Sequence, residues 1–182
     1  LTQILFRASL IKEVKTVEPS YIAYVTAQAC KQEDIQKLIA ECLGDIVIFD
    51  TKNHTTLIID VGSKIWLASL SWSYDQRYLS YSDGYDIHVF DVKNGTATNL
   101  TDNESATLEY FSKWSPQGYK IALTSHLNLN DPRPSLWVYS LDGEDPIKVA
   151  DNFTGSITWS PTSDRIVFSQ PINPSDPPDW YV

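Results

Sequence analysis

Short apolar segments alternate with polar, turn-rich segments through most of the chain. Residues 78–81, 120–123 and 165–168 are three apolar segments of similar length, and residues 86–91 and 135–140 follow the first two. Such segments, rich in aromatic and β-branched residues and bounded by Gly, Pro, Asn and Asp, are typical of β-strands. Asn-Gly and Asp-Gly pairs at residues 94–95 and 142–143 supply the positive φ that tight hairpins require. The pattern therefore predicts an all-β chain made of antiparallel hairpins.

One phrase containing Trp-Ser recurs along the chain and divides it into units. Its copies lie at residues 71–75, 113–118 and 158–164, and their tryptophans are 42 and 45 residues apart. This interval matches one four-stranded blade of a β-propeller. Radial stacking of such sheets buries both apolar faces of each one. We therefore expect each of the repeated tryptophans, Trp72, Trp114 and Trp159, to pack between neighbouring blades.

A more divergent copy of the unit precedes these three. Residues 20–25, 44–50 and 55–60 resemble its second, third and fourth strands. The last copy is shortened, because a Pro-rich segment at 171–178 follows its second strand and residues 179–182 resemble only the start of a third.

The predicted fold class is therefore all-β, a β-propeller of about four blades of four-stranded antiparallel sheets, the last blade incomplete. The blades are predicted at residues 20–60, 67–101, 109–151 and 155–182. Residues 1–182 form either one compact ring, closed by pairing of residues 3–8 with the last sheet, or a fragment of a larger ring. We favour the fragment, because the chain stops where a strand should begin. A fragment would expose unpaired edges and is expected to self-associate.

One segment departs from the β pattern and predicts a short inserted helix near residues 31–43. Its apolar residues are spaced i, i+3, i+4, i+7 and i+8, which makes one stripe on a helix; they are Ile35, Leu38, Ile39, Cys42 and Leu43. Such a helix would place Cys30 and Cys42 about 18 Å apart along its axis, too far for a disulfide. It would lie on one rim of the propeller, either packed on it as a lid or free to dock a partner. Packing is the more usual role of an amphipathic helix.

Composition narrows the classes of function. The formal net charge is −9 at pH 7 and no basic cluster is present, which argues against nucleic-acid binding. The chain lacks a run of about 18 apolar residues, so no membrane insertion is expected. Two cysteines are too few for a disulfide framework and do not match zinc-ligand spacing.

The sequence contains neither the Gly-x-Ser-x-Gly motif of serine hydrolases nor the His-Glu-x-x-His motif of zinc proteases. The histidines, His54, His88 and His126, lie in separate repeats. We interpret His88 as a structural residue on a strand and the other two as solvated. We therefore predict no catalytic residue, no cofactor and no bound metal.

Five Asn-x-Ser/Thr triplets occur, and most of them coincide with turns or outer strands of the repeat. They begin at Asn53, Asn94, Asn99, Asn103 and Asn152. We interpret most of them as turn chemistry, with glycosylation in a secreted protein as the alternative.

The repeat resembles that of the TolB-like (WD40-like, PD40) β-propeller family. The resemblance rests on Trp-Ser-Pro-Gln-Gly at 114–118, Ile-Ala-Leu at 121–123 and residues 86–101, and it covers residues 67–170 firmly and 20–60 loosely. The sequence departs from the family pattern at Tyr74, at Gln117 and at residues 163–164. The resemblance implies a protein-interaction platform, often in a bacterial periplasm. It also covers accessory domains of serine peptidases and some lyases that bind a metal through histidines.

We therefore predict a non-catalytic scaffold that binds a protein or peptide, in a periplasmic or extracellular location, with a cytoplasmic one as the alternative. The candidate partner-binding residues are Ile35, Leu38, Ile39, Asn130, Asp131 and Arg133, on the predicted helix and in the loop at 128–134. The first alternative is the gating propeller of a prolyl-oligopeptidase- or dipeptidyl-peptidase-like hydrolase whose catalytic domain is not in this chain. The second is a metal-dependent oligogalacturonate-lyase-like propeller that would use His88.

Overall fold

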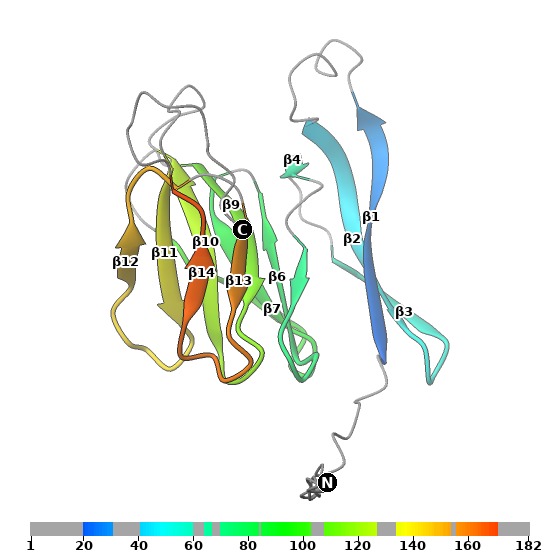
Figure 1. Cartoon of the computed structure of the whole chain (residues 1–182). Helices are drawn as coiled ribbons and strands as arrows, with labels where there is room; N and C mark the ends of the chain where they lie inside the picture. The colour runs from blue at the N-terminus through cyan, green and yellow to red at the C-terminus, as the bar shows by residue number, and fades with distance from the viewer. Residues whose placement is uncertain are drawn as a thin grey trace, which may run out of the picture.

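The computed structural model describes residues 20–30, 41–59, 64–66, 70–83, 85–102, 108–126, 134–153 and 156–170. All regular elements in these ranges are β-strands, and they form antiparallel sheets that stand side by side (Figure 1). The predicted all-β fold class is therefore confirmed. No helix in the described ranges is long and apolar enough to cross a membrane.

The first sheet has the order β1-β2-β3, with β4 paired to the other half of β2. Its strands are β1 (Tyr21–Cys30), β2 (Glu41–Asp50), β3 (Thr55–Ile59) and β4 (Lys64–Trp66). The predicted second, third and fourth strands of the divergent copy are thus confirmed as β1, β2 and β3.

The helix predicted for residues 31–43 is wrong for residues 41–43, which begin strand β2. Cys42 and Leu43 pair with Cys30 and Ala29 of β1 on one side, and residues 41–43 pair with β4 on the other. Backbone hydrogen bonds to two neighbouring strands override a helical spacing of apolar residues that is only a local signal. The backbones of Cys30 and Cys42 consequently lie opposite each other in register, and the helical separation expected between them is also wrong. Residues 31–40, with Ile35, Leu38 and Ile39, lie outside the described part of the chain.

The second and third sheets each contain four strands in simple antiparallel order, and two strands of the last sheet are described. The second sheet comprises β5 (Ser71–Trp72), β6 (Tyr78–Ser82), β7 (Ile87–Asp91) and β8 (Thr96–Asn99). The third comprises β9 (Leu108–Trp114), β10 (Lys120–His126), β11 (Ser135–Ser140) and β12 (Ile147–Ala150). The last comprises β13 (Ile157–Trp159) and β14 (Ile166–Phe168). The third strand predicted at residues 179–182 and the pairing predicted for residues 3–8 lie outside the described ranges.

Equivalent backbone hydrogen bonds show that the first three sheets are structural copies of one unit. In each, the residue after the third strand of the unit donates to the carbonyl of the residue before the second. These bonds run from Thr51 N to Ser20 O (2.8 Å), from Val92 N to Arg77 O (2.9 Å) and from Leu141 N to Tyr119 O (3.1 Å). Tyr-Ile-Ala-Tyr at 21–24 is therefore equivalent to Tyr-Leu-Ser-Tyr at 78–81.

The turn that follows the third strand of the unit is also repeated. The Asp50 carboxylate accepts bonds from the N–H of Lys52 and Asn53 and from Asn53 Nδ2, at 2.8–3.0 Å. Asp91 accepts the same set from Lys93 and Asn94. Such carboxylate-capped turns are a common use of Asp and Asn. The side chains of Asn53 and Asn94 are thus turn residues, as the sequence predicts.

Each sheet has a leading face, which packs on the preceding sheet, and a trailing face, which receives the following one. The repeated tryptophans lie at these junctions. Trp114 Nε1 donates to Ser71 O and to Ser80 Oγ, both at 3.0 Å, and Trp159 Nε1 donates to Lys113 O at 3.1 Å. Each acceptor carbonyl therefore belongs to the residue before the preceding tryptophan. The prediction that the tryptophans pack between blades is confirmed.

Apolar clusters fill all three junctions between the four sheets. The buried members are Ile46, Ile48, Ile59, Leu79, Tyr81 and Phe90 at the first, Val89, Trp114 and Ile121 at the second, and Ala122, Leu136, Phe153, Ile157 and Trp159 at the third. Tyr21 stacks on Trp72 and Tyr78 stacks on Trp114, with ring centroids 6.0 Å apart in both pairs. Stacking of these rings thus stabilises the junctions in addition to the burial of apolar area.

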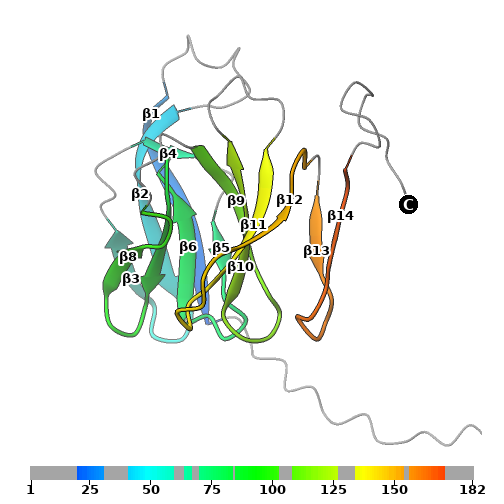
Figure 2. The same cartoon turned by 90° about the vertical axis from the view of Figure 1, so that its left-hand side faces the viewer.

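The sheets converge along one edge and diverge along the other. The indole hydrogen bonds join β9 to β5 and β13 to β9, so the first strands of successive sheets lie close together. Towards the last strands, grooves open at equivalent positions. One is lined by Tyr21, Ile48, Asp50, Leu57 and Val92, and the next by Tyr78, Val89, Asp91, Thr98 and Leu141. Figure 2 shows the sheets in chain order, from β1–β3 at one end of the row to β13–β14 at the other.

Candidate functional site

The two rims of the stack differ in their connections. The turns at residues 51–54, 73–77, 92–95, 115–119, 141–146 and 160–165 all lie on one rim, which we call the turn rim (Figure 1). The other, which we call the loop rim, holds the β6–β7 turn at 83–86 and the strand ends that flank residues 31–40 and 127–133. The predicted partner-binding residues Asn130, Asp131 and Arg133 lie in the second of these segments, outside the described ranges. The candidate site described below is therefore made of the described residues of the loop rim.

Asp83 organises the β6–β7 turn on this rim. Its Oδ1 accepts hydrogen bonds from the N–H groups of Tyr85 and Asp86, both at 2.9 Å, and its Oδ2 lies 3.0 Å from His88 Nε2. The His88 ring stacks on Tyr81 at 5.2 Å between centroids. These contacts are those of a structural histidine, as interpreted from its place on a strand.

Opposing influences set the pKa of Asp83. Burial alone would raise this pKa, but the hydrogen bonds from His88, Asp86 and Tyr85 outweigh it and hold the pKa at about 2. The side chain is ionised at neutral pH, and hydrogen bonds within the turn stabilise its charge.

This lowered pKa predicts an acid-sensitive contribution to stability. The ionised Asp83 stabilises the folded state above pH 4, and the contribution is lost as pH falls from about 4 towards 2. From the size of the shift we expect it to reach about 2 kcal/mol. Urea unfolding of the wild type and Asp83→Asn at several pH values should show curves that differ most at pH 5–6 and converge near pH 2. A constant difference would contradict this account.

Asp86 fastens the outer strand to the same turn. Its carboxylate accepts a hydrogen bond from Asn99 Nδ2 at 2.9 Å and a longer one from Thr101 Oγ1 at 3.4 Å. Thr101 Oγ1 in turn accepts from the N–H of Ile87 at 2.9 Å. The Leu-Thr at residues 100–101 therefore closes the second unit through the hydroxyl of Thr101, and Asn99 has a structural role.

A third carboxylate, that of Glu109, lies buried behind the turn at the start of β9. The N–H of Glu109 donates to Tyr85 O at 3.2 Å, and Ser82 Oγ donates to Glu109 O at 2.7 Å. Burial, with the nearby charges of Glu109 and Asp86, raises the pKa of Tyr139 to about 12.

Phe111 is displayed on β9 by a β-bulge. Lys113 pairs with Ala122 and Tyr110 with Thr124, so Phe111 and Ser112 together oppose Leu123. The backbone of Phe111 has φ of 45°, which is unusual for a bulky residue, and its side chain is 59% exposed. Bulges commonly re-aim a side chain near binding sites.

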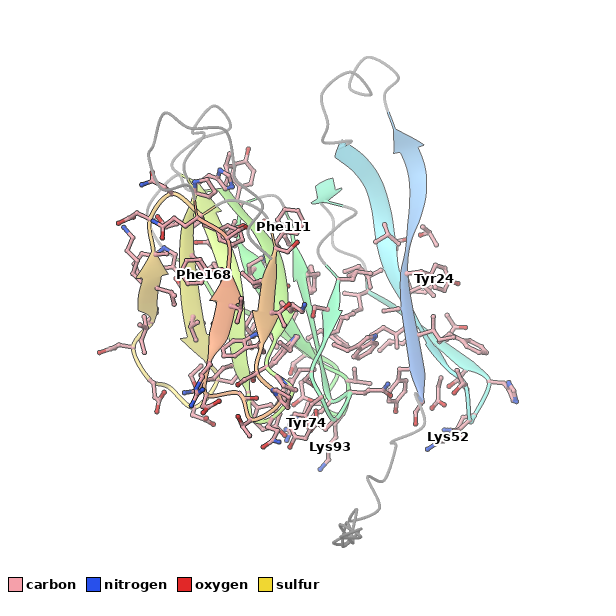
Figure 3. The ribbon with its side chains drawn as sticks, in the orientation of Figure 1. Tyr24, Lys52, Tyr74, Lys93, Phe111 and Phe168 are labelled. Atoms are coloured by element: carbon pink, nitrogen blue, oxygen red, sulfur yellow. The ribbon has the colours of Figure 1, made fainter. Side chains whose placement is uncertain are left out.

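The exposed Tyr85 lies beside the start of β9, because its carbonyl accepts from the N–H of Glu109, and Phe111 follows two residues later on the same strand. Figure 3 shows Phe111 on the part of the sheets away from Tyr74 and Lys93, which mark the turn rim. We name Tyr85 and Phe111, with the neighbouring carboxylates of Asp83 and Asp86, the rim patch. Sequence reasoning missed the patch, because no sequence signal marks a bulge inside an apolar run.

In the described ranges, no three His, Cys, Asp or Glu side chains gather in a metal-binding arrangement. The rim patch offers exposed aromatic surface beside carboxylates that the turn itself holds in place. Such groups can hold a ligand by contact and charge.

The arrangement of sheets was compared with known proteins. No protein-family profile matches the chain, and no curated protein sequence matches it. A solved TolB structure from Agrobacterium tumefaciens is similar over 80% of this chain and 52% of that one, with 19% identity and a TM-score of 0.56. A chain of a nidogen/laminin complex is similar over 72% of this chain and 51% of that one, with 13% identity and a TM-score of 0.52. The fold is a β-propeller. This chain spans about half the length of both solved chains.

In a propeller the first strand of each blade lies nearest the axis, where the blades converge. Here β5, β9 and β13 occupy that place, as the indole hydrogen bonds between them require. Phe111 is therefore on the first strand of a propeller blade, opposite Leu123 in the middle of β10. The likeness to the two solved chains shows the fold, and it assigns no ligand.

Proposed function

We propose that this propeller is a non-catalytic scaffold that binds a protein or peptide on its loop rim. The observation that carries the proposal is Phe111, a large apolar side chain kept 59% exposed by a bulge with positive φ. Backbone strain of this kind persists where the surrounding structure enforces it, and it concentrates at binding and catalytic sites. A rigidly displayed aromatic residue is also the usual centre of a binding hot spot.

The chemistry of the rim patch favours a ligand that combines apolar and basic groups. Tyr85 is 65% exposed and offers a second ring near the start of the strand that carries Phe111. Asp83, ionised at neutral pH, lies in the same turn, and the carboxyl groups of Asp86 and Glu109 lie close to it. A peptide with an aromatic or aliphatic residue next to Lys or Arg would meet both features.

The chain offers a matched pair of exposed tyrosines for testing the proposal. Tyr85 belongs to the loop rim and Tyr74, which is 51% exposed, belongs to the turn rim. We expect a random peptide library displayed on phage and selected on the immobilised protein to yield apolar, basic peptides. Tyr85→Ala should weaken their binding by about tenfold or more, a hot-spot effect, while Tyr74→Ala leaves it unchanged. Equal effects of both variants, or no selected peptide, would reject the rim patch as the binding surface.

The proposal extends to domain organisation and location. We propose that residues 1–182 form one propeller or a piece of one, with blades near 20–60, 67–101, 109–151 and 155–182, in a periplasmic or extracellular compartment. The fold likeness to TolB and the TolB-like repeat pattern support both. Cell fractionation of the source organism tests the location, and recovery in the cytoplasm would contradict it.

A further inference from the structure

The two cysteines of the chain lie opposite each other on neighbouring strands of the first sheet. Cys30 is the last residue of β1 and Cys42 is the second residue of β2, and the two are Cα partners in the antiparallel pairing. The sequence contains no other cysteine, so each has a single thiol of the same chain to pair with. The two strand ends lie on the loop rim, where they flank residues 31–40 (Figure 1).

A register shift in the pairing of β1 with β2 produces this alignment. The shift places one extra residue in β1, after which pairing resumes with Ala29 opposite Leu43. Without the extra residue, Cys42 would lie opposite Ala29, and Cys30 would lie opposite Glu41. A slip of one residue moves a side chain to the other face of a sheet. The shift therefore decides whether the two cysteines are partners.

The rest of the sheet holds both strands in this register. Tyr21 at the start of β1 stacks on Trp72, and Ile46 of β2 is fully buried at the same junction. The start of β2 also pairs with β4 on its other side, where Ile65 is the Cα partner of Cys42. The relative position of the two cysteine backbones is thus set by contacts that do not involve the thiols.

Directly opposite residues of an antiparallel pair have the separation that a disulfide needs. Their Cα atoms lie about 4.5 or 5.5 Å apart, depending on their place in the ladder, and disulfides join Cα atoms about 4.4–6.8 Å apart. We propose that Cys30 and Cys42 form a disulfide, which joins the end of β1 to the start of β2. The bond would fasten both ends of residues 31–40 to the loop rim.

The bond forms by exchange with an external disulfide, such as glutathione disulfide. One cysteine thiolate attacks a sulfur of the external disulfide, releases one thiol and leaves a mixed disulfide. The second cysteine thiolate then attacks the protein sulfur of this mixed disulfide and releases the second thiol. The cysteines thus lose two electrons and two protons, which leave with the two released thiols. Persistence of the bond in the cell rests on the proposed periplasmic or extracellular location, because such compartments are oxidising.

The test equilibrates the purified whole chain with mixtures of reduced and oxidised glutathione. An alkylating reagent then blocks free thiols, and intact mass spectrometry counts them. We expect no free thiol in the wild type under oxidising mixtures and two after reduction. Peptide mapping without reduction should join the segment that contains Cys30 to the one that contains Cys42.

The matched control is the double variant Ala29→Cys, Cys30→Ser. It has the same number of thiols, but one of them is moved by one residue along β1 to the position opposite Leu43. Because neighbouring residues of a strand project to opposite faces, this thiol and that of Cys42 are separated by the sheet. We expect the equilibrium constant for forming its disulfide from glutathione disulfide to be at least about tenfold lower than that of the wild type.

Circular dichroism checks that both proteins are folded, and reduction of the wild type tests the bond without any substitution. Three results would each overturn the inference: free thiols in the wild type under oxidising mixtures, a disulfide between two chains, or equal equilibrium constants for the wild type and the control. Purified protein in a defined mixture makes the result independent of peptide binding and of the cell compartment. A failure here therefore leaves the proposed function standing.

Discussion

Trp114→Ala is expected to lower the free energy of unfolding by about 3–5 kcal/mol, the cost of removing a large buried aromatic side chain. Trp114 is buried between the second and third sheets, where it stacks on Tyr78 and donates to both Ser71 O and Ser80 Oγ. The substitution leaves a cavity at the junction and removes the indole N–H, which donates both hydrogen bonds. Urea unfolding monitored by far-ultraviolet circular dichroism measures the change.

Two further variants separate the contributions at this junction. Trp114→Phe keeps most of the ring but loses the N–H, so we expect a loss of about 1–3 kcal/mol, because two hydrogen bonds at about 0.5–1.5 kcal/mol each are removed. Trp137→Ala is the matched control, because Trp137 is half-buried on β11 and Lys148 Nζ lies over its ring. Its cost should be clearly below that of Trp114→Ala. Equal costs would show that Trp114 is no special anchor.

Phe111→Gly is expected to raise the stability of the protein while weakening its binding of rim-patch peptides. A non-Gly residue in the left-handed region destabilises the folded state by about 1–2 kcal/mol. Gly avoids this strain, but it loses more conformational entropy on folding, which offsets about half of the gain. The net gain should be about 0.5–1 kcal/mol, because the exposed Phe111 side chain contributes little burial. Loss of the aromatic side chain should weaken peptide binding by about thirtyfold, the effect of a hot-spot residue.

Phe111→Ala is the control, since it removes the ring but keeps the strain at φ of 45°. It should lose binding to the same extent as Phe111→Gly without the gain in stability. Thermal unfolding and titration calorimetry with a selected peptide give the two readouts. If Phe111→Gly proved less stable than the wild type, the strain argument and the functional interpretation built on it would be wrong.

The sequence predicted the repeat because its signals recur. The Trp-Ser phrases are evenly spaced, and each tryptophan packs at a junction between sheets. The prediction of the repeat therefore does not depend on any single position. The divergent copy at 20–60 was found from its strand pattern, although it lacks the tryptophan phrase. His88 was interpreted correctly from its place between Ile87 and Val89.

Features decided by single long-range contacts were not predictable. Residues 41–43 have helical spacing, but pairing with β1 and β4 makes them a strand. The bulge at Phe111 depends on how β9 pairs with β10, which no local pattern in 108–114 records. The rim patch also joins a turn and a strand through backbone atoms of Tyr85 and Glu109, and backbone contacts are independent of residue type.

The indole-to-carbonyl bonds at successive junctions have a consequence for how such a protein can change in length. Trp114 and Trp159 use the backbone carbonyl before the preceding tryptophan, so the acceptor is present whatever side chain stands there. A duplicated or deleted unit would meet its new neighbour with donor and acceptor already in place. We therefore expect that units carrying this tryptophan can be added or removed as whole blades, by recombination or by design, without redesign of the junctions that use these bonds.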